Sequence, residues 1–480
     1  MPDFEPVIGL EIHAQLLTAS KIFCGCSTAF GAAPNTHICP VCIGLPGALP
    51  VQNRAAVDAA IRAGLALGCA IHERSIFARK NYFYPDLPKG YQISQYELPI
   101  ATGGVVEFPI GGRTRRVGIT RVHMEEDAGK SLHEGFVDAD RKSYVDYNRS
   151  GVPLIEIVSE PDLRSAPDAA EFFSRLRAIL VWLGVNDGNM DEGSLRCDAN
   201  VSVRPRGQAA LGTKAEVKNL NSFRFLQRAL EHEIARQIDL LGEGGRVVQE
   251  TRLWDAASGR TVSMRSKEEA HDYRYFPEPD LPPVIVDAER IARIRAAMPE
   301  LPDARRRRLV EAFGLPEYDA GQLTQSRALA DYFEAAVRAG APAKAASNWI
   351  MGELAHALKA RGADAAASPL DPERLAGLIA LVEKGAISGS MAKGVFEKMY
   401  ATKQTADAIV AAEGLAQIDD EPQIVALIAE VLAANAGPVA DYRGGKASAF
   451  GFLVGKVMKA AAGKANPTRV NELLKRALEA

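Results

Sequence analysis

Strand-type and helix-type patterns occupy different parts of this 480-residue chain. Up to about residue 288, short runs rich in β-branched residues alternate with glycine turns such as Gly103-Gly104 and Gly111-Gly112. From there to the C-terminus, strand signals vanish and alanine-rich helical periodicities dominate. This segregation predicts a strand-rich α+β region followed by all-α modules. A chain of this length exceeds one hydrophobic core, so about two to four domains are expected.

Composition and charge restrict the classes of partner. Hydrophobic residues make up 47% of the chain and charged residues 24%, which excludes wholesale disorder. The net charge of −3 means that any contact with nucleic acid requires a local basic patch. Between Asp441 and Ala480, eight basic residues stand against three acidic ones, an excess of five. That tail fits a contact with phosphate backbones, although a solvated helical face has the same composition.

The sequence contains no charged-then-apolar leader and no apolar run as long as a membrane span. We therefore expect a cytoplasmic protein without a membrane contact.

An N-terminal strand carries polar groups on one face only. Ile8, Leu10, Ile12, Ala14 and Leu16 alternate, which places Glu11, His13 and Gln15 together on the opposite face. Ionisable groups separated by one residue lie roughly 6.5–7 Å apart along a strand. This spacing suits a Mg²⁺ site in which one group is a direct ligand and its neighbour is bridged through water.

Further carboxylates occur where isolated charges are costly. Glu125, Glu126 and Asp127 follow a predicted strand over residues 116–124, and Glu156 stands alone in the apolar run 151–161. A charged surface turn could explain the first group, and a buried Arg or Lys partner could explain Glu156. We favour one shared Mg²⁺ ion, because it accounts for all three segments together.

Four of the six cysteines form a Cys-x-Cys…Cys-x-x-Cys pattern: Cys24, Cys26, Cys39 and Cys42. In a reducing compartment this spacing predicts a zinc knuckle rather than disulfides. Four thiolates leave no open position on the metal, so we expect a structural role. His37 is an alternative ligand, although it is more simply a bystander.

The segment 79–95 is aromatic, contains two prolines and carries Lys80 and Lys89. It is an Ω-loop packed by its own side chains, or it contacts phosphate, a carboxylate or a base.

Gly129-Lys130-Ser131 imitates the end of a P-loop, but Met124 stands where the upstream glycine is required. A carboxylate-rich metal site without an evident nucleophile fits metal-assisted phosphoryl transfer.

Several long motifs give the chain an end-to-end resemblance to a known family. They are Val7-Ile-Gly-Leu-Glu-Ile-His13, Arg79-Lys-Asn-Tyr-Phe-Tyr-Pro-Asp86, His123-Met-Glu-Glu-Asp-Ala-Gly-Lys130, Pro153-Leu-Ile-Glu-Ile-Val-Ser-Glu-Pro-Asp162, Gly193-Ser-Leu-Arg-Cys-Asp-Ala-Asn200 and Asp272-Tyr-Arg-Tyr-Phe-Pro-Glu-Pro-Asp280. They resemble the GatB family, the B subunits of aspartyl/glutamyl-tRNA amidotransferases. The resemblance implies a cradle domain (1–290), an all-α helical domain (291–405) and a YqeY-like tail domain that contacts tRNA (406–480).

The same resemblance implies an activity. ATP would phosphorylate the side-chain carboxylate of misacylated Glu-tRNA(Gln) or Asp-tRNA(Asn), and ammonia would then displace phosphate to give the amide. Ammonia would come from glutamine cleaved by an amidase A subunit and reach the site through a tunnel, with a small C subunit joining the two.

Individual residues match the family's functional positions. Glu11, His13, Glu126 and Glu156 match its metal-binding positions, and Glu125 lies close by. Lys80 and Glu126 match positions on the ammonia path. The expected catalytic residues are thus Lys80, Glu125 and Glu126, with ATP, Mg²⁺ and a structural Zn²⁺ as cofactors.

Two other functions stay open at this point. The chain could be a zinc-stabilised tRNA-binding adaptor whose carboxylates are structural, or a stand-alone metal hydrolase, which its size and basic tail disfavour. No nucleotide-binding fingerprint shows where adenine binds, and the sequence does not choose between the two misacylated tRNAs.

Overall fold

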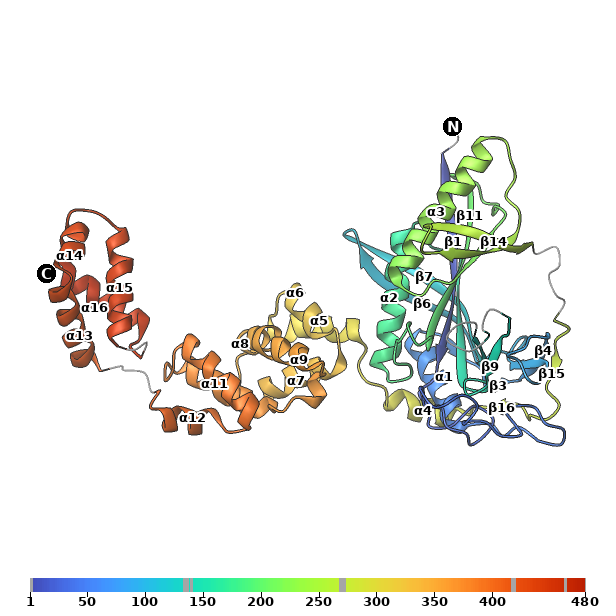
Figure 1. Cartoon of the computed structure of the whole chain (residues 1–480), viewed down its shortest axis with the longest axis horizontal. Coiled ribbons are helices and arrows are strands. Elements are labelled where there is room, and N and C mark those ends of the chain that lie inside the picture. Colours follow the sequence, from blue (N-terminus) through green and yellow to red (C-terminus); the bar gives the residue numbers. More distant parts are fainter. Residues whose placement is uncertain are drawn as a thin grey trace. The chain divides into compact units, whose positions relative to one another are not determined.

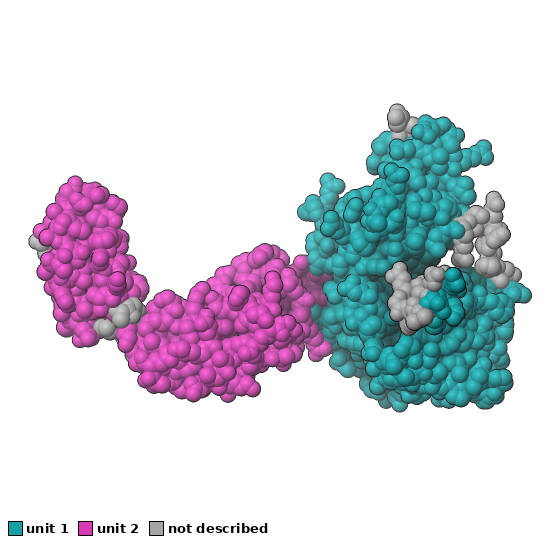
Figure 2. Space-filling model, viewed as in Figure 1, with its two compact units in different colours: residues 1–301 teal, residues 302–480 magenta. Residues whose placement is uncertain are grey.

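The computed structural model describes residues 3–132, 138, 141–266, 273–415, 420–461 and 464–479. It contains two compact units, Met1–Leu301 and Pro302–Ala480, which Figure 2 shows in different colours.

A 12-stranded sheet forms the first unit (Figure 1). Its strand order is β14-β13-β12-β11-β1-β10-β7-β5-β4-β15, with β6 paired to β7 and β2 to β6. The central strands β11, β1, β10 and β7 pair antiparallel, whereas β12 and β13 pair parallel. Two small ribbons, β3 with β16 and β8 with β9, lie outside this sheet. The strands are β1 (Phe4–Gln15), β2 (Ala70–Ile71), β3 (Arg74–Ser75), β4 (Ala78–Asn81), β5 (Tyr91–Ser94), β6 (Ala101–Ile110), β7 (Arg113–Glu126), β8 (Lys130–Leu132), β9 (Tyr144–Asp146), β10 (Pro153–Ser159), β11 (Leu195–Pro205), β12 (Ala215–Lys218), β13 (Glu250–Asp255), β14 (Arg260–Ser266), β15 (Phe276–Pro277) and β16 (Val284–Ile285).

Helices cover the apolar face of this sheet. The predicted alternation in β1 is confirmed, because Ile8, Leu10, Ile12 and Ala14 are all fully buried in the core that the helices complete. Helix α1 (Arg54–Ala66) packs against β6 and β7, α2 (Ala166–Trp182) against β6, and α3 (Phe223–Gly242) against β11 and β14. The helices leave the opposite face of β1 uncovered, and this face carries Glu11, His13 and Gln15.

Side-chain caps begin the three covering helices. The Asn53 side chain accepts hydrogen bonds from the N–H groups of Ala55 and Ala56 at the start of α1. Ser165 and Ser222 cap α2 and α3 in the same way. A polar N-cap is typically worth about 1 kcal/mol, because it satisfies a backbone donor that the helix leaves unpaired.

Helix α4 (Ala288–Ala296) belongs to the first unit. Ile294 lies in its hydrophobic core, and Arg290 forms an ion pair with Asp58 of α1, with Nε 2.7 Å from Oδ1. The first unit therefore continues to Leu301, whereas the resemblance places a boundary at residue 290.

The second unit is helical, and the last strand in the described residues is β16. Its buried apolar side chains form two clusters, one from Leu309 to Ile409 and one from Ile424 to Leu478. Helix α12 contributes to the first cluster, although the expected boundary at residue 405 precedes it. We keep the three-domain division as a proposal. The helices are α5 (Pro302–Phe313), α6 (Glu317–Leu323), α7 (Arg327–Arg338), α8 (Ala343–Trp349), the π-helix η2 (Ile350–Leu354), α9 (Ala355–Arg361), the 3-10 helix η3 (Ala365–Ala367), α10 (Pro372–Glu383), α11 (Gly389–Thr402), α12 (Ala406–Glu413), α13 (Glu421–Ala434), α14 (Ala436–Arg443), α15 (Ser448–Ala460) and α16 (Pro467–Glu479).

No single helix among the described residues is long and apolar enough to cross a bilayer. Only α13 and α14 taken together meet that test by length and composition, and they are bent by 94° at their junction.

Candidate metal centre

Four polar residues form a row across the centre of the sheet. In the antiparallel register, His13 of β1 lies opposite Arg196 of β11 on one side and Glu156 of β10 on the other. Glu156 in turn lies opposite His123 of β7. Directly opposed residues point to the same face, so residues far apart in sequence meet on the face that the helices leave uncovered.

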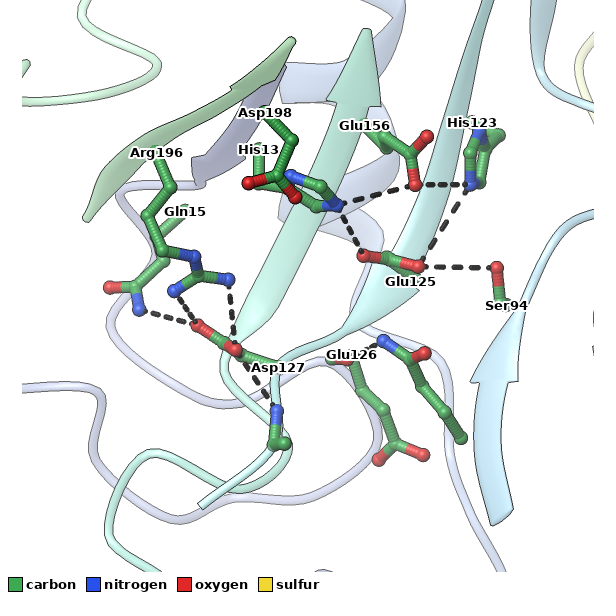
Figure 3. A network of polar contacts seen from close by, with 12 residues as sticks. His13, Gln15, Ser94, His123, Glu125, Glu126, Asp127, Glu156, Arg196 and Asp198 are labelled. Carbon is green, nitrogen blue, oxygen red and sulfur yellow. Dashed lines mark hydrogen bonds and ion pairs between the residues drawn. The ribbon is translucent and has the colours of Figure 1, made fainter. Parts of the chain in front are cut away.

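Glu125 lies two residues from His123 along β7, and its carboxylate converges with Glu156 and the two imidazoles of this row (Figure 3). His13 Nε2 lies 3.3 Å from Glu156 Oε2 and 3.8 Å from Glu125 Oε1. His123 Nε2 lies 3.4 Å from Glu156 Oε2 and 3.9 Å from Glu125 Oε2. Ser94 also donates to Glu125 at 3.3 Å. One ligand atom each from His13, Glu125 and Glu156 lies within 4.8 Å of the others, a separation at which they could share one metal ion.

The electrostatics of this group favour a bound cation. Burial, together with the charge of Glu156, raises the pKa of Glu125 to about 7. Burial opposes the charge of Glu156 too, but His123 and His13 hold its pKa well below the usual range. Glu125, unlike Glu156, thus lacks sufficient positive charge, and a divalent cation would supply it. The oxygen-rich donor set, with one imidazole, therefore fits the expected Mg²⁺.

Lys80 of β4 adds a fixed positive charge beside the group. Its Nζ lies 4.9 Å from the centre of the Tyr273 ring and 5.9 Å from that of Tyr82. Burial disfavours its charge, but Glu125 and the surrounding tyrosine hydroxyls hold the pKa of Lys80 above its usual value. The structure therefore brings the predicted Lys80 to the centre. Asp272, which begins the neighbouring motif, lies outside the described residues.

Glu126 lies apart from the other predicted ligands. Its carboxylate is bound by Lys89 Nζ and by the backbone N–H of Ile93, the latter at 2.8 Å. Successive side chains of a strand point to opposite faces, so Glu126 cannot join Glu125. Instead, Glu126 and Lys89 line a cavity of about 200 Å³ that also touches Cys24 and Cys42. The metal set expected from the resemblance differs from the observed group at this residue.

Glu11 shares the face of His13 but is not in the group. It accepts a hydrogen bond from Asn200 Nδ2 at 2.9 Å. Burial and the negative charge of Glu156 raise the pKa of Glu11. The charge of the central group therefore also acts on Glu11. A role for Glu11 at the metal, whether direct or through water, stays a prediction.

Asp127 has partners of its own. Its carboxylate accepts hydrogen bonds from Gln15 at 2.7 Å and from two nitrogens of Arg196 at 2.9 and 3.1 Å. Arg149 lies 3.7 Å away. Burial opposes its charge, but these arginines hold the pKa of Asp127 far below its usual range. The three consecutive carboxylates are thus stabilised separately, and not by one shared cation as the sequence suggested.

His123 also lies at the centre but is not among the site residues expected from the sequence. The alternation applied to β1 also holds for β7, where Arg121, His123 and Glu125 share one face. Applying that two-residue period to β7 would have identified His123. Among the described residues, the ion pairs of Glu156 involve the two imidazoles, and none involves Arg or Lys.

The four predicted zinc ligands come together in the first unit. The sulfur atoms of Cys24, Cys26, Cys39 and Cys42 lie within 4.8 Å of one another. The Cys39 N–H donates to Cys42 Sγ at 3.1 Å. His37 is not part of the cluster, and its N–H donates to Asn148 instead. Four sulfurs at this separation fit a tetrahedral zinc with no position left for a substrate.

Comparison with known families first defines the class of protein. Residues 6–292 match the family model of the GatB/GatE catalytic domain, so the unit that carries the metal centre is a catalytic domain of this class. Residues 331–478 match the model described as the GatB domain.

Relatives that match over nearly the whole chain then specify the family. They are the B subunits of aspartyl/glutamyl-tRNA(Asn/Gln) amidotransferases from several bacteria. The chain is 60% identical over 480 residues to the relative from Anaeromyxobacter sp. (strain K), covering 99% of each chain. It is 56% identical to the relative from Geobacter sulfurreducens, covering 99% of this chain and 100% of that one. It is 55% identical to the relative from Carboxydothermus hydrogenoformans, covering 99% of each. The chain belongs to this family of amidotransferase B subunits.

Proposed function

We propose that this protein is the component of a tRNA-dependent amidotransferase that activates and amidates the side chain of misacylated Glu-tRNA(Gln) or Asp-tRNA(Asn). The observation that carries the proposal is the largely buried group of His13, Glu125 and Glu156 at the centre of a domain that matches a catalytic family. A tRNA-binding adaptor would have no need for a second buried carboxylate, Glu125, beside one that is already paired.

The side-chain carboxylate of the substrate is a poor electrophile. It must therefore acquire a leaving group before ammonia can attack it. The substrate carboxylate attacks the γ-phosphate of ATP, which gives an acyl phosphate and ADP, and ammonia then displaces phosphate to form the amide. A Mg²⁺ ion held by His13, Glu125 and Glu156 would neutralise charge between phosphate and carboxylate. Lys80 adds a positive charge close by, where the substrate carboxylate and phosphate would otherwise repel each other.

Glu126 has a different role in this proposal. Because it pairs with Lys89 at a cavity whose lining includes none of the central residues, we place it on the ammonia path and not among the metal ligands. A polar lining provides hydrogen-bond acceptors and donors for ammonia, and a narrow path keeps water from the acyl phosphate.

The proposal includes partners. Ammonia would be produced by an amidase A subunit, and a small C subunit would join the two in a heterotrimer. The tRNA substrate places the complex in the cytoplasm.

The proposed function is tested by measuring amidation with the purified A and C subunits, ATP, each misacylated tRNA, and either glutamine or ammonium. Product with ammonium but without the amidase would support the proposal, and tRNA binding without amidation under any condition would support the adaptor.

We expect loss of zinc to destabilise the loop that holds the cysteines. The substitution Cys42→Ser removes the one buried thiolate of the four, so bound zinc should fall below one equivalent and protease cleavage within residues 24–51 should accelerate. Zinc is measured by elemental analysis and cleavage by mass spectrometry. Cys69→Ser is the matched control, since Cys69 is a buried thiol outside the cluster. Full zinc content in Cys42→Ser would contradict the assignment.

The basic tail should provide salt-dependent affinity for tRNA. Replacing the exposed Lys456, Lys459 and Lys475 with Gln should weaken tRNA binding and flatten its dependence on salt, because each lost phosphate contact removes released counterions. The slope of log affinity against log salt should fall by about 0.7–0.9 per contact. The same change at three exposed lysines of the preceding cluster (Lys359, Lys384 and Lys403) is the control. An unchanged slope in the tail variant would contradict this role.

A further inference from the structure

The two imidazoles of the candidate centre are nearly equivalent by distance. Both Nε2 atoms approach Glu156 Oε2, at 3.3 Å for His13 and 3.4 Å for His123. Both also approach Glu125, at 3.8 and 3.9 Å. Distance alone does not show which ring offers a lone pair to a cation and which donates a hydrogen bond.

Arg121 distinguishes the two rings. Its Nε lies 3.4 Å from His123 Nδ1 and donates a hydrogen bond to it. A guanidinium N–H can only donate, so His123 Nδ1 must be the unprotonated nitrogen. In a neutral imidazole the hydrogen then resides on the other nitrogen, Nε2, which is the atom that faces Glu156.

We propose that His123 is a positioning residue that donates its Nε2–H to Glu156 and is not a ligand of the cation. His13 then remains the imidazole of the ligand set, as in the proposed function on which this inference rests. The Nε2 lone pair of His123 does not exist in this tautomer, so His123 cannot be a ligand through the atom that faces the group. A neutral donor orients Glu156 without adding a charge that would compete with the cation.

The strand register supports this division. His13 and His123 lie opposite Glu156 from β1 and β7, one on each side of β10. One neighbour can therefore fix the carboxylate while the other completes the ligand set. Arg121, His123 and Glu125 share one face of β7, so the strand itself keeps the arginine beside the ring whose tautomer it sets.

Manganese binding to the full-length protein, measured by electron paramagnetic resonance, tests the two roles without relying on activity. His123→Leu should weaken Mn²⁺ binding by about 10- to 100-fold, the usual effect of losing an outer partner of a ligand. His123→Gln should restore binding to within a few-fold of wild type, because its carboxamide N–H can replace the donor. His13→Leu should weaken binding at least as strongly as His123→Leu, since it removes a ligand atom itself and supplies no replacement. His72→Leu, which removes a ring bonded to Thr102 elsewhere in the unit, is the control and should leave binding unchanged.

The opposite result would overturn the inference. If His123→Gln binds as weakly as His123→Leu while His13→Leu retains affinity, His123 is the ligand. The tautomer is read independently from the ¹⁵N chemical shifts of labelled histidines in the metal-free protein, where the His123 signal should show hydrogen on Nε2. Hydrogen on Nδ1 would also overturn the assignment. A wild-type protein that binds no Mn²⁺ would count against the proposed function itself, and the shifts would still decide the tautomer.

Discussion

Glu156→Gln should reduce ATP-dependent amidation with ammonium by about 100-fold or more while tRNA binding stays unchanged. Loss of even an outer partner of a metal ligand typically costs about 10–100-fold, and Glu156 is itself a ligand in the proposed site. The substitution keeps the size of the side chain but removes the negative charge that a cation needs. Supplying ammonium directly makes the assay independent of the amidase. Rates and tRNA affinities should be measured on the same assembled complex.

Glu107→Gln is the matched control for this experiment. Glu107 lies on β6 of the same sheet, is 60% exposed and pairs only loosely with Arg116 at 3.8 Å. Its replacement should change amidation less than twofold, because exposed pairs contribute little. Normal amidation by Glu156→Gln would show that the carboxylates are structural and would favour the adaptor.

Phe172→Ala should lower the free energy of unfolding of the first unit by about 3–5 kcal/mol. Phe172 is completely buried between α2 and the sheet, with its ring centre 6.2 Å from that of Phe108 on β6. The truncation leaves a cavity that surrounding side chains fill only in part. Unfolding is followed in urea by tryptophan fluorescence in a Trp349→Phe background, so that Trp182 and Trp254 report only on the first unit.

Phe83→Ala is the control, because this ring is 84% exposed and its removal should change stability by less than about 0.5 kcal/mol. Equal effects of the two substitutions would mean that the contact between α2 and the sheet does not stabilise the unit.

The sequence alone determined the local elements and the cysteine cluster. Alternation defined β1, because a strand that is buried on one face must repeat its apolar residues with a period of two. The spacing of the four cysteines predicted their cluster, because two short Cys-x-Cys and Cys-x-x-Cys pairs can close around one metal without distant contacts.

Tertiary structure alone decided which polar groups meet. Glu125 and Glu126 are neighbours in sequence but face opposite sides of β7, whereas His13 and Glu156 are far apart in sequence and directly opposed in the sheet. Strand register decides such pairings, and it depends on the packing of the whole sheet against its helices. For the same reason, no local pattern could assign Arg196 to Asp127 or His123 to Glu156.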